Sequence, residues 1–570
     1  MKSDRGVAFF VGLRTIRQGS EDRVCPVATV QQVAASRSGV SGLAELARAF
    51  QTQEDVVRQG GSPAGHRRQE QFGRLTARQR LGELLDNGRP LLELGLWAAW
   101  QMYPDWGEIP AAGVLTAVGF VRDRPVMVVA NDATVKAGAF FPQTVKKVLR
   151  AQRIAMAFRL PLVYLVDSAG VFLPLQDEIF PDQDDFGRIF RNNAVISAMG
   201  IPQYAAVMGN CVAGGAYLPV LSDTLLITEG SQLYLAGPAL VKAAIGQAAE
   251  PEELGGARMH AEISGTADYR EPDDHACLAR LRSLIALVPN AVRPPTSEPH
   301  TPQRAAEDVY QIVPADGQSQ YDARDLLACL VDAGSVQEFR ADYGQTVVTA
   351  FARIQDRPVG VVANQRRRSR SAAGEVQIGG VMYGDSAEKA ARFVMECNQT
   401  LLPIVFLQDV QGFMVGKRAE QSGIIRSGAK LVNVVSNSAV PKLTVIVGGS
   451  FGAGSYALCG KAFDPWLILA WPSARYTVMG ADQAAETLLQ LHLREAERAG
   501  RPVPDKERQR LHADIRAQYE QQTDIRYGAA RGWVDAIIAP HETRHWLATA
   551  LSLLPDQSTW GQFHTGMLQV

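Results

Sequence analysis

Cysteine is scarce in this sequence of 570 residues, and its six copies follow no metal-binding or redox pattern. They lie far apart without a C-x-x-C spacing, which argues against a zinc ribbon or a thioredoxin-like redox pair. Of the nine histidines, only His541 and His545 share an H-x-x-x-H spacing, and they lie in a polar stretch. We therefore expect no metal site, and we predict a reduced, cytoplasmic setting.

An excess of charge, long apolar runs and nucleotide motifs are also lacking. The formal net charge is −1, which gives no attraction to nucleic acid or to a membrane surface. No apolar run reaches the roughly 18–20 residues that a membrane span needs. A P-loop and a biotin-attachment motif are both missing, so this chain shows no sign of using ATP or of carrying biotin itself. The apolar patch Val7–Leu13 weakly resembles a signal-peptide core, but without a clear cleavage site we expect a disordered tail.

An internal duplication organises the chain. Three blocks recur in the same order, at offsets of 233, 242 and 239 residues, which is the pattern of a repeat with loop insertions. The matched blocks are Val121–Asn131 with Ile354–Asn364, Leu160–Gly170 with Leu402–Gly412, and Ile201–Tyr217 with Val440–Tyr456. Each copy of the third block is an apolar run that ends in glycines, which predicts a buried strand followed by a tight turn.

Strands alternate with helices in both copies, which predicts an α/β layered fold. Helices are expected at Gln143–Phe158 and Ala387–Gln399, a basic amphipathic helix at Arg74–Leu85, a charged helical segment at Ala484–Gln522 and a closing strand at Val534–Ile538. Hydrophobic residues make up 46% of the chain, enough for full globular cores. We predict an N-terminal tail with helices over 1–72, a first domain over 73–288, a proline-containing linker over 289–320 and a second domain over 321–570.

The glycine turns allow three interpretations. As oxyanion holes, the backbone N–H groups of Gly214–Gly215 and of Ala453–Gly454 would each stabilise a developing negative charge on oxygen. As a G-x-S-x-G nucleophile elbow, the second turn would present Ser450. Its triad partners would come from Asp464 or Asp482 and His492 or His541. As purely structural glycines, the turns would only allow tight packing of strand on helix.

Several longer motifs resemble the carboxyltransferase (β) subunit of biotin-dependent acyl-CoA carboxylases, nearest the methylcrotonyl-CoA and geranyl-CoA carboxylase branch. The resemblance covers roughly Gly73–Leu554. Its carriers are the motifs Asn131–Lys136, Val145–Lys147, Leu173–Pro174 with Gln176–Glu178, Phe186–Phe190, Ala213–Tyr217, Gly412–Gly416 and Gly448–Gly454.

The resemblance implies two tandem crotonase-like domains of the ClpP/crotonase superfamily, each a ββα superhelix. It implies that the first domain holds the acyl-CoA and the second holds carboxybiotin carried by a partner chain, a biotin carboxylase and biotin carrier subunit. The active site would form between neighbouring copies in a hexamer, a dimer of trimers. Gly214 and Gly215 would hold the thioester enolate, and Ala453 and Gly454 the ureido oxygen of biotin. Biotin itself would take the substrate proton, so no side-chain base is implied and no metal is needed.

Further contacts follow from the resemblance alone. Cationic side chains near the phosphates of coenzyme A would be Arg78, Lys146 and Lys147, although a solvated helix face remains the alternative for the lysines. The acyl-CoA would also contact Ala169, Gly170, Val171, Phe172, Ala213, Ala216 and Tyr217. Carboxybiotin would also contact Gly412, Phe413, Met414, Val415, Gly416 and Gly452.

Two segments depart from the family pattern. The run Asp167–Phe172 replaces an aspartate-serine-glycine-glycine-alanine-asparagine sequence, and Leu175 stands where an arginine is expected. These changes add apolar bulk, so the acyl group is expected to differ from methylcrotonyl. The arginine-rich segment 365–371, followed by Ile378–Gly380 and taken with Ser168–Val171, partly resembles the carboxyltransferase subunit of glutaconyl-CoA decarboxylase. The arginines of the segment are read as a surface loop or an anion contact. A decarboxylase direction, a serine hydrolase using Ser450 and a non-catalytic scaffold therefore stay open.

Overall fold

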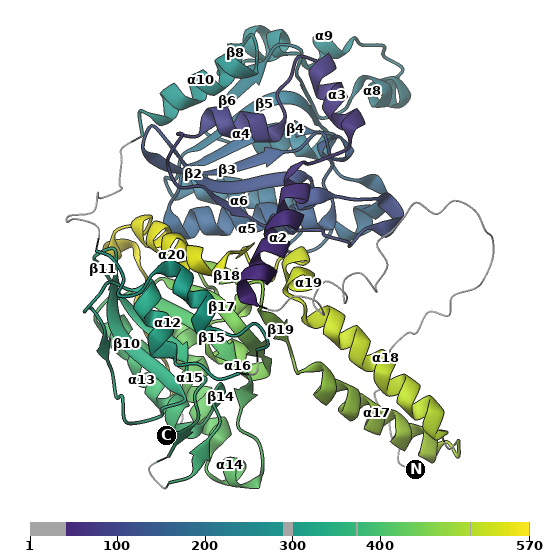
Figure 1. Ribbon diagram of the computed structural model, residues 1–570. Coiled ribbons are helices and arrows are strands. Elements are labelled where there is room, and N and C mark those ends of the chain that lie inside the picture. Colours follow the sequence, from purple (N-terminus) through teal and green to yellow (C-terminus); the bar gives the residue numbers. More distant parts are fainter. Residues whose placement is uncertain (1–41, 289–299, 318, 372–373, 502, 569–570) are drawn as a thin grey trace. The chain divides into compact units, whose positions relative to one another are not determined.

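The structure is a computed structural model that describes residues 42–288, 300–317, 319–371, 374–501 and 503–568 (Figure 1). We call residues 42–288 the first half and the described residues from 300 onward the second half. The expected tail at Val7–Leu13 and the proline-rich start of the linker lie outside the described residues. The domain limits given above stay predictions.

The first half is built on an eight-stranded sheet in the order β1-β2-β3-β4-β5-β6-β8, with β7 added alongside β5. Its strands are β1 Leu92–Leu94, β2 Val114–Val121, β3 Arg124–Asn131, β4 Leu162–Ser168, β5 Gln203–Val212, β6 Thr224–Thr228, β7 Gln232–Tyr234 and β8 Tyr269–Glu271. The β1-β2-β3 pairs are antiparallel, and the pairs from β3 to β8 are parallel.

The second half repeats this sheet strand for strand, in the order β9-β10-β11-β15-β17-β18-β20, with β19 added alongside β17. Its strands are β9 Gln337–Glu338, β10 Val347–Ile354, β11 Arg357–Asn364, β15 Ile404–Val410, β17 Lys442–Phe451, β18 Leu467–Ala470, β19 Arg475–Thr477 and β20 Ala536–Ile537. Two small ribbons are formed by β12 Ser369–Arg370 with β13 Val376–Gln377 and by β14 Val381–Met382 with β16 Gly412–Phe413. The duplicated α/β order predicted from the sequence is confirmed.

Helices cover both faces of the first sheet (Figure 1). Along β3 the side chains alternate between the faces, as a pleated strand requires. Val126 and Val128 pack toward α4 and α10, whereas Met127 and Val129 pack toward α5. The helices of this half are α2 Leu43–Arg58, α3 Pro63–Gln71, α4 Ala77–Leu84, α5 Pro142–Phe158, α6 Phe186–Ala198, α7 Tyr217–Val220, α8 Pro238–Ile245, α9 Pro251–Gly255 and α10 Asp274–Ile285.

The second sheet is covered in the same way. Helices α13 and α15 pack on one face, and α12 and α20 pack on the other. The helices of this half are α11 Val309–Ile312, α12 Ala323–Leu330, α13 Gly384–Gln399, α14 Lys417–Gln421, α15 Ile424–Asn437, α16 Gly452–Ala457, α17 Ala481–Arg498, α18 Asp505–Thr523, α19 Ile525–Ala530 and α20 Thr543–Ser552. The largest apolar cluster contains residues of both halves, so the halves share a core.

Three sequence expectations differ in detail from the structure. The charged segment Ala484–Gln522 forms two helices, α17 and α18, because α17 ends at Arg498 beside Gly500, whose φ of +66° is left-handed, and Pro504 directly precedes α18 (Figure 1). The described end of the expected linker contains α11, and Val309 is buried in the core. The closing strand is shorter than expected, at β20 Ala536–Ile537.

Candidate active site

The first glycine turn follows the end of β5. A short 3₁₀ segment, Ala213–Ala216, begins directly after Val212 and leads into α7. Ala213 has a φ of +56°, an unusual value for a residue with a side chain. Gly214 is half-buried and Gly215 is buried. The N–H groups in the first turn of a helical segment have no acceptor within it, so this turn offers backbone donors at the end of the strand.

The second glycine turn repeats this geometry after β17. Helix α16 begins at Gly452, whose φ of +53° matches that of Ala213. Ala453 is exposed and Gly454 is buried. Gly454 therefore lies at the place equivalent to Gly215, and its N–H group is again in the first turn of the segment.

A buried aspartate supports the strand just before each turn. The Asp167 carboxylate accepts a hydrogen bond from the Asn210 N–H at 3.1 Å. The Asp409 carboxylate accepts one from the Gly449 N–H at 2.8 Å. The register of the parallel strands shifts next to both aspartates, between Val166 and Ser168 and between Gln408 and Val410. The two halves thus hold their turns by the same contact.

Each aspartate needs a glycine opposite it. A Cβ atom at Gly209 would lie 2.1 Å from the Asp167 carboxyl carbon. A Cβ atom at Gly448 would lie 2.5 Å from the nearer Asp409 carboxylate oxygen. Both distances are far below van der Waals contact, so only glycine lets the carboxylate approach the strand.

A buried arginine faces each aspartate, and it comes from a different element in each half. Arg80 on α4 lies 3.6 Å from Asp167 and 2.8 Å from Asp274, and it donates to the Met208 carbonyl at 2.7 Å. Arg366, just after β11, lies 3.4 Å from Asp409. Burial raises the pKa of both Asp167 and Asp409, and the arginines oppose that rise.

The interpretation of segment 365–371 as a surface loop is wrong for Arg366. Its side chain is 6% exposed and donates to the Gly317 carbonyl at 2.8 Å. The fold places this residue behind the second turn because β11 ends at Asn364, beside β15. Arg368 and Arg370, in contrast, do lie at or near the surface.

The predicted acyl-CoA residues gather around the first turn. A Cβ atom at Gly215 would lie 3.9 Å from the Gly170 Cα, so the loop after β4 touches the turn. Phe140 fixes this loop, because its N–H donates to the Gly170 carbonyl at 2.8 Å and its carbonyl accepts the Phe172 N–H at 2.9 Å. Ala169, Ala213 and Tyr217 are exposed, Val171 is half-buried and Ala216 is buried.

An aromatic cluster lies beside this loop. The Phe172 ring stacks on Phe141 with centroids 4.2 Å apart, and it meets Trp106 edge to face at 5.0 Å. Tyr103 also packs against Phe141, and Leu175 joins the same apolar cluster. Phe172 and Leu175 are two of the departures from the family pattern. They therefore contribute apolar surface next to the first turn.

The predicted carboxybiotin residues gather around the second turn. A Cβ atom at Gly454 would lie 3.4 Å from the Gly412 Cα, so the loop after β15 again touches the turn. The Met414 N–H donates to the Met382 carbonyl at 2.8 Å and ties this loop to β14. Val415 is 76% exposed. Phe413, Gly416 and Gly452 complete the set, and Phe413 and Gly452 are half-buried.

Arg78 and Lys147, two of the three predicted CoA contacts, make contacts that recur in the other half. Arg78 pairs with Glu93 at 2.8 Å, and Arg324 pairs with Glu338 at 2.8 Å. Because the same ion pair occurs in the half without a predicted CoA site, we read Arg78 as a part of the scaffold.

Lys147 is buried, and its ammonium group donates to the carbonyls of Ala111 at 2.9 Å and Val114 at 2.6 Å. Burial lowers the pKa of Lys147 to about 7. Lys389 lies at the equivalent place on α13 and donates to the Val347 carbonyl at 2.8 Å. The structure does not support the predicted contact of Lys147 with a CoA phosphate, because two backbone carbonyls hold its ammonium group against the start of β2.

Lys146 has no such counterpart. It is exposed on α5, and the equivalent residue on α13 is Glu388, which pairs with Lys430 at 3.2 Å. The residue at this position is therefore positively charged in the first half and negatively charged in the second. Lys146 stays a predicted contact of coenzyme A.

The nucleophile-elbow interpretation of Ser450 is wrong. Ser450 lies within β17, fully buried, and its hydroxyl donates to the Gln408 side-chain carbonyl at 2.7 Å. Of the candidate triad members, His541 shares a hydrogen bond with the Tyr310 hydroxyl at 2.7 Å, and Asp482 pairs with Arg516 at 2.8 Å. The serine therefore has neither the exposure nor the base that a nucleophile needs.

Within the described part of the chain, no cluster of three or more histidine, cysteine or carboxylate side chains is arranged to hold a metal. None of the helices in that part is long and apolar enough to cross a bilayer.

The paired arginines were missed by sequence reasoning. Asp167 and Asp409 occupy matched positions of the repeat, and that match was a usable signal. Arg80 and Arg366 carry no such signal, because Leu326 is equivalent to Arg80 and Ala133 is equivalent to Arg366. Only the folded chain brings them to the same place.

Comparison with known proteins gives a consistent result. The carboxyl transferase domain family matches residues 68–564. The biotin-dependent 3-methylcrotonyl-coenzyme A carboxylase beta1 subunit of Mycobacterium tuberculosis is 44% identical over 515 residues, which cover 88% of this chain and 94% of that protein. The mitochondrial methylcrotonoyl-CoA carboxylase beta chain of Dictyostelium discoideum is 40% identical over 509 residues, covering 88% of this chain and 84% of the relative. The crystal structure of the beta subunit of P. aeruginosa geranyl-CoA carboxylase superposes with a TM-score of 0.81 at 32% identity, covering 93% of this chain and 96% of that one.

Proposed function

The chain belongs to the carboxyl transferase family, and on that premise we propose that it transfers a carboxyl group from carboxybiotin on a partner chain to an acyl-CoA or enoyl-CoA. The resemblance to biotin-dependent acyl-CoA carboxylase β subunits and the crotonase-like α/β fold are confirmed. The observation that carries the proposal is the pair of matched glycine turns, since a transfer between two carbonyl compounds needs a donor site for each oxygen.

The first turn is assigned to the acyl-CoA. Removal of a proton from the carbon that reacts leaves negative charge on the thioester oxygen, as an enolate. The N–H groups of Gly214 and Gly215 stabilise that charge without reorganising, because Asp167 and Arg80 fix the strand that leads into the turn.

The second turn is assigned to biotin. Its donors are the neutral N–H groups of Ala453 and Gly454, and its neighbours Phe413, Met414 and Val415 are apolar and partly exposed. A neutral, largely apolar ring with one polar ureido oxygen fits such a surface. When bound, carboxybiotin would supply the carboxyl group and biotin would accept the substrate proton, so that its N–CO₂ bond and one substrate C–H bond break as one C–C bond and one N–H bond form.

We propose an apolar acyl chain that differs in size from methylcrotonyl. The support is the aromatic cluster of Phe141, Phe172 and Trp106 beside the loop that touches the first turn. Apolar side chains at Phe172 and Leu175 favour a hydrocarbon over a charged acyl end, because a buried carboxylate without a partner is unfavourable. This preference also argues against a glutaconyl-like substrate.

The partners and setting follow the same premise. A biotin carboxylase and biotin carrier subunit would deliver the carboxyl group, and further copies of this chain would complete a dimer of trimers in which the first half of one copy faces the second half of another. A cytoplasmic setting is supported by five described cysteines, all of which are free and buried.

The test combines the purified chain with a biotinylated carrier, biotin carboxylase, ATP and labelled bicarbonate, and screens CoA thioesters of increasing apolar length. Label is expected in at least one branched apolar acyl-CoA. The proposal is refuted if no thioester acquires label although the carrier itself is carboxylated. The direction of the reaction is tested by supplying carboxylated acyl-CoA and free carrier without ATP. A sustained rate of CO₂ release above the rate of carboxylation would favour the decarboxylase.

A further inference from the structure

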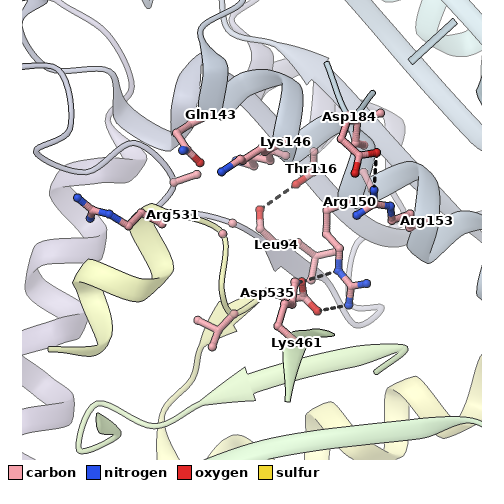
Figure 2. Close-up of a pocket in the computed structure, with 17 residues that line it drawn as sticks. Leu94, Thr116, Gln143, Lys146, Arg150, Arg153, Asp184, Lys461, Arg531 and Asp535 are labelled. Atoms are coloured by element: carbon pink, nitrogen blue, oxygen red, sulfur yellow. Dashed lines mark hydrogen bonds and ion pairs between the residues drawn. The ribbon is translucent and has the colours of Figure 1, made fainter. Parts of the chain in front are cut away.

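A cationic cavity lies away from the glycine turns, where α5 of the first half meets the second half. Its volume is about 250 Å³. Apolar residues such as Leu94, Ala98 and Val534 form part of its wall. Its charged lining consists of Lys146, Lys147, Arg150, Arg153, Lys461 and Arg531 against Asp184 and Asp535 (Figure 2). Six basic side chains and two carboxylates therefore line the cavity.

One carboxylate serves two of these cations. Asp535 is 1% exposed and lies 2.7 Å from both the Arg150 guanidinium and the Lys461 ammonium. Figure 2 shows Arg150, Asp535 and Lys461 together on one side of the cavity. Arg150 also donates to the carbonyls of Pro465 at 3.0 Å and Trp466 at 3.3 Å, whereas Lys461 has Asp535 as its one ion-pair partner among the described residues.

Lys461 has unused donors. Its ammonium group carries three N–H bonds, and among the described residues it donates only to Asp535. Burial and the neighbouring Arg150 lower the pKa of Lys461 to about 8. An anion beside Lys461 would raise that value, because an opposite charge favours the protonated form.

Lys146 supplies a second unpaired charge. Within the described residues its ammonium group has neither a hydrogen-bond partner nor an ion-pair partner. Gln143, one turn earlier on α5, lines the same cavity with an amide that can donate (Figure 2). Lys147, in contrast, contributes mainly its aliphatic stem, since its ammonium group is held by two backbone carbonyls.

We propose that this cavity is a binding site for a phosphate-class anion, held between Lys146 and Lys461 with Arg150 and Asp535 as its rigid floor. Phosphate oxygens accept charge-assisted hydrogen bonds from ammonium groups, and a cavity of about 250 Å³ has room for a small phosphate-bearing group. Because the residues come from both halves, the bound anion holds the halves together. The site does not depend on the proposed carboxyl transfer.

The test is binding of inorganic phosphate to the full chain in its native assembly, followed by thermal unfolding and calorimetry at constant ionic strength. Saturable stabilisation is expected. Lys146→Ala and Lys461→Gln are each expected to weaken phosphate binding by about 10-fold, since each removes a charge-assisted hydrogen bond. Lys506→Ala, which removes an exposed lysine on α18, is the matched control and should bind like the unchanged chain.

The proposal is overturned if phosphate gives no saturable stabilisation, or if both cavity variants keep it. Lys146 is exposed, so its variant keeps the test valid even if Lys461→Gln folds poorly. Two further binding measurements, with coenzyme A and with pantetheine as competitors, identify which molecule carries the phosphate. If coenzyme A competes with phosphate and pantetheine does not, the site takes the phosphates of the substrate. If phosphate and coenzyme A bind together, it takes a free anion. Both results are independent of turnover, so they separate this site from the proposed activity.

Discussion

The two halves of this chain share a scaffold and differ in a few exposed or half-buried positions. Both halves place a buried aspartate against the strand that ends in a glycine turn. In both halves a buried lysine, Lys147 on α5 or Lys389 on α13, donates to a carbonyl at the start of a strand. Contacts that recur in two sites with different proposed ligands serve the fold.

Positions that differ between the halves are the better candidates for ligand recognition. Lys146 corresponds to Glu388, Phe172 to Met414, and Leu175 to Lys417. The chain therefore contains its own control: the second half shows which residues of the first half the fold requires. By this criterion Lys146 and Phe172 are stronger candidates for substrate contact than Arg78 and Lys147.

The largest expected effect comes from the arginines behind the turns. Arg80→Leu removes the arginine that lies within ion-pair distance of both buried carboxylates, Asp167 and Asp274, and about 3–5 kcal/mol of unfolding free energy should be lost. Arg366→Leu should be milder, because Asp409 still accepts the Tyr321 hydroxyl and the Gly449 N–H. Chemical denaturation of both variants measures the difference. Equal losses would mean that the two arginines are equivalent despite their different partners.

The next effect concerns the donors in the turns. Gly214→Pro and Ala453→Pro each remove one N–H group in the first turn of a helical segment, where proline is otherwise tolerated. Each should lower kcat by about 10²–10³-fold, with little change in melting temperature. Gly214→Ala keeps the N–H group and copies the second half, so it should stay active. Near-normal turnover in either proline variant would refute the oxyanion role of that turn.

A smaller effect should distinguish the two buried glycines. A Cβ atom at Gly454 would lie 2.6 Å from a Val410 methyl group, whereas one at Gly215 would meet nothing closer than 3.9 Å. Gly454→Ala should therefore lose about 1–3 kcal/mol of unfolding free energy through overpacking, and Gly215→Ala less than about 1 kcal/mol. Thermal unfolding of both variants checks the order, and the reverse order would contradict the tighter packing around Gly454.

The smallest effect tests the recurring ion pair. Arg78→Gln and Arg324→Gln should each change the unfolding free energy by only about 0.2–1 kcal/mol, because both pairs are partly exposed. Neither should change the KM for acyl-CoA. A raised KM in the Arg78 variant alone would restore Arg78 as a contact of coenzyme A.

The repeat predicted much of the fold and part of the site. Each glycine turn, with its preceding strand, could be predicted because Ile201–Tyr217 and Val440–Tyr456 align without a gap. The burial of Lys147 was also readable, since Lys389 occupies the same place in the other copy. The resemblance to the family instead indicated that Lys147 contacts coenzyme A, and that prediction was preferred.

The arginines behind the turns could not be predicted, for a physical reason. Arg366 belongs to a polar, arginine-rich run that is typical of a surface loop, and its burial depends on the long-range approach of β15. The cavity at the junction of the halves could not be predicted from the sequence either. Its opposite walls, Lys146 and Lys461, are brought together by tertiary packing and leave no pattern in the sequence.

The two buried arginines also say something about descent. A duplication copies residues in register, so a pair inherited from the single ancestral domain would occupy equivalent positions in both copies. Arg80 and Arg366 do not: their equivalents are Leu326 and Ala133. At least one copy has therefore changed at these positions since the duplication, whereas both copies have the aspartate. The same buried carboxylate can thus be paired from two different places in the fold, which means that the position of the arginine is less constrained than its charge.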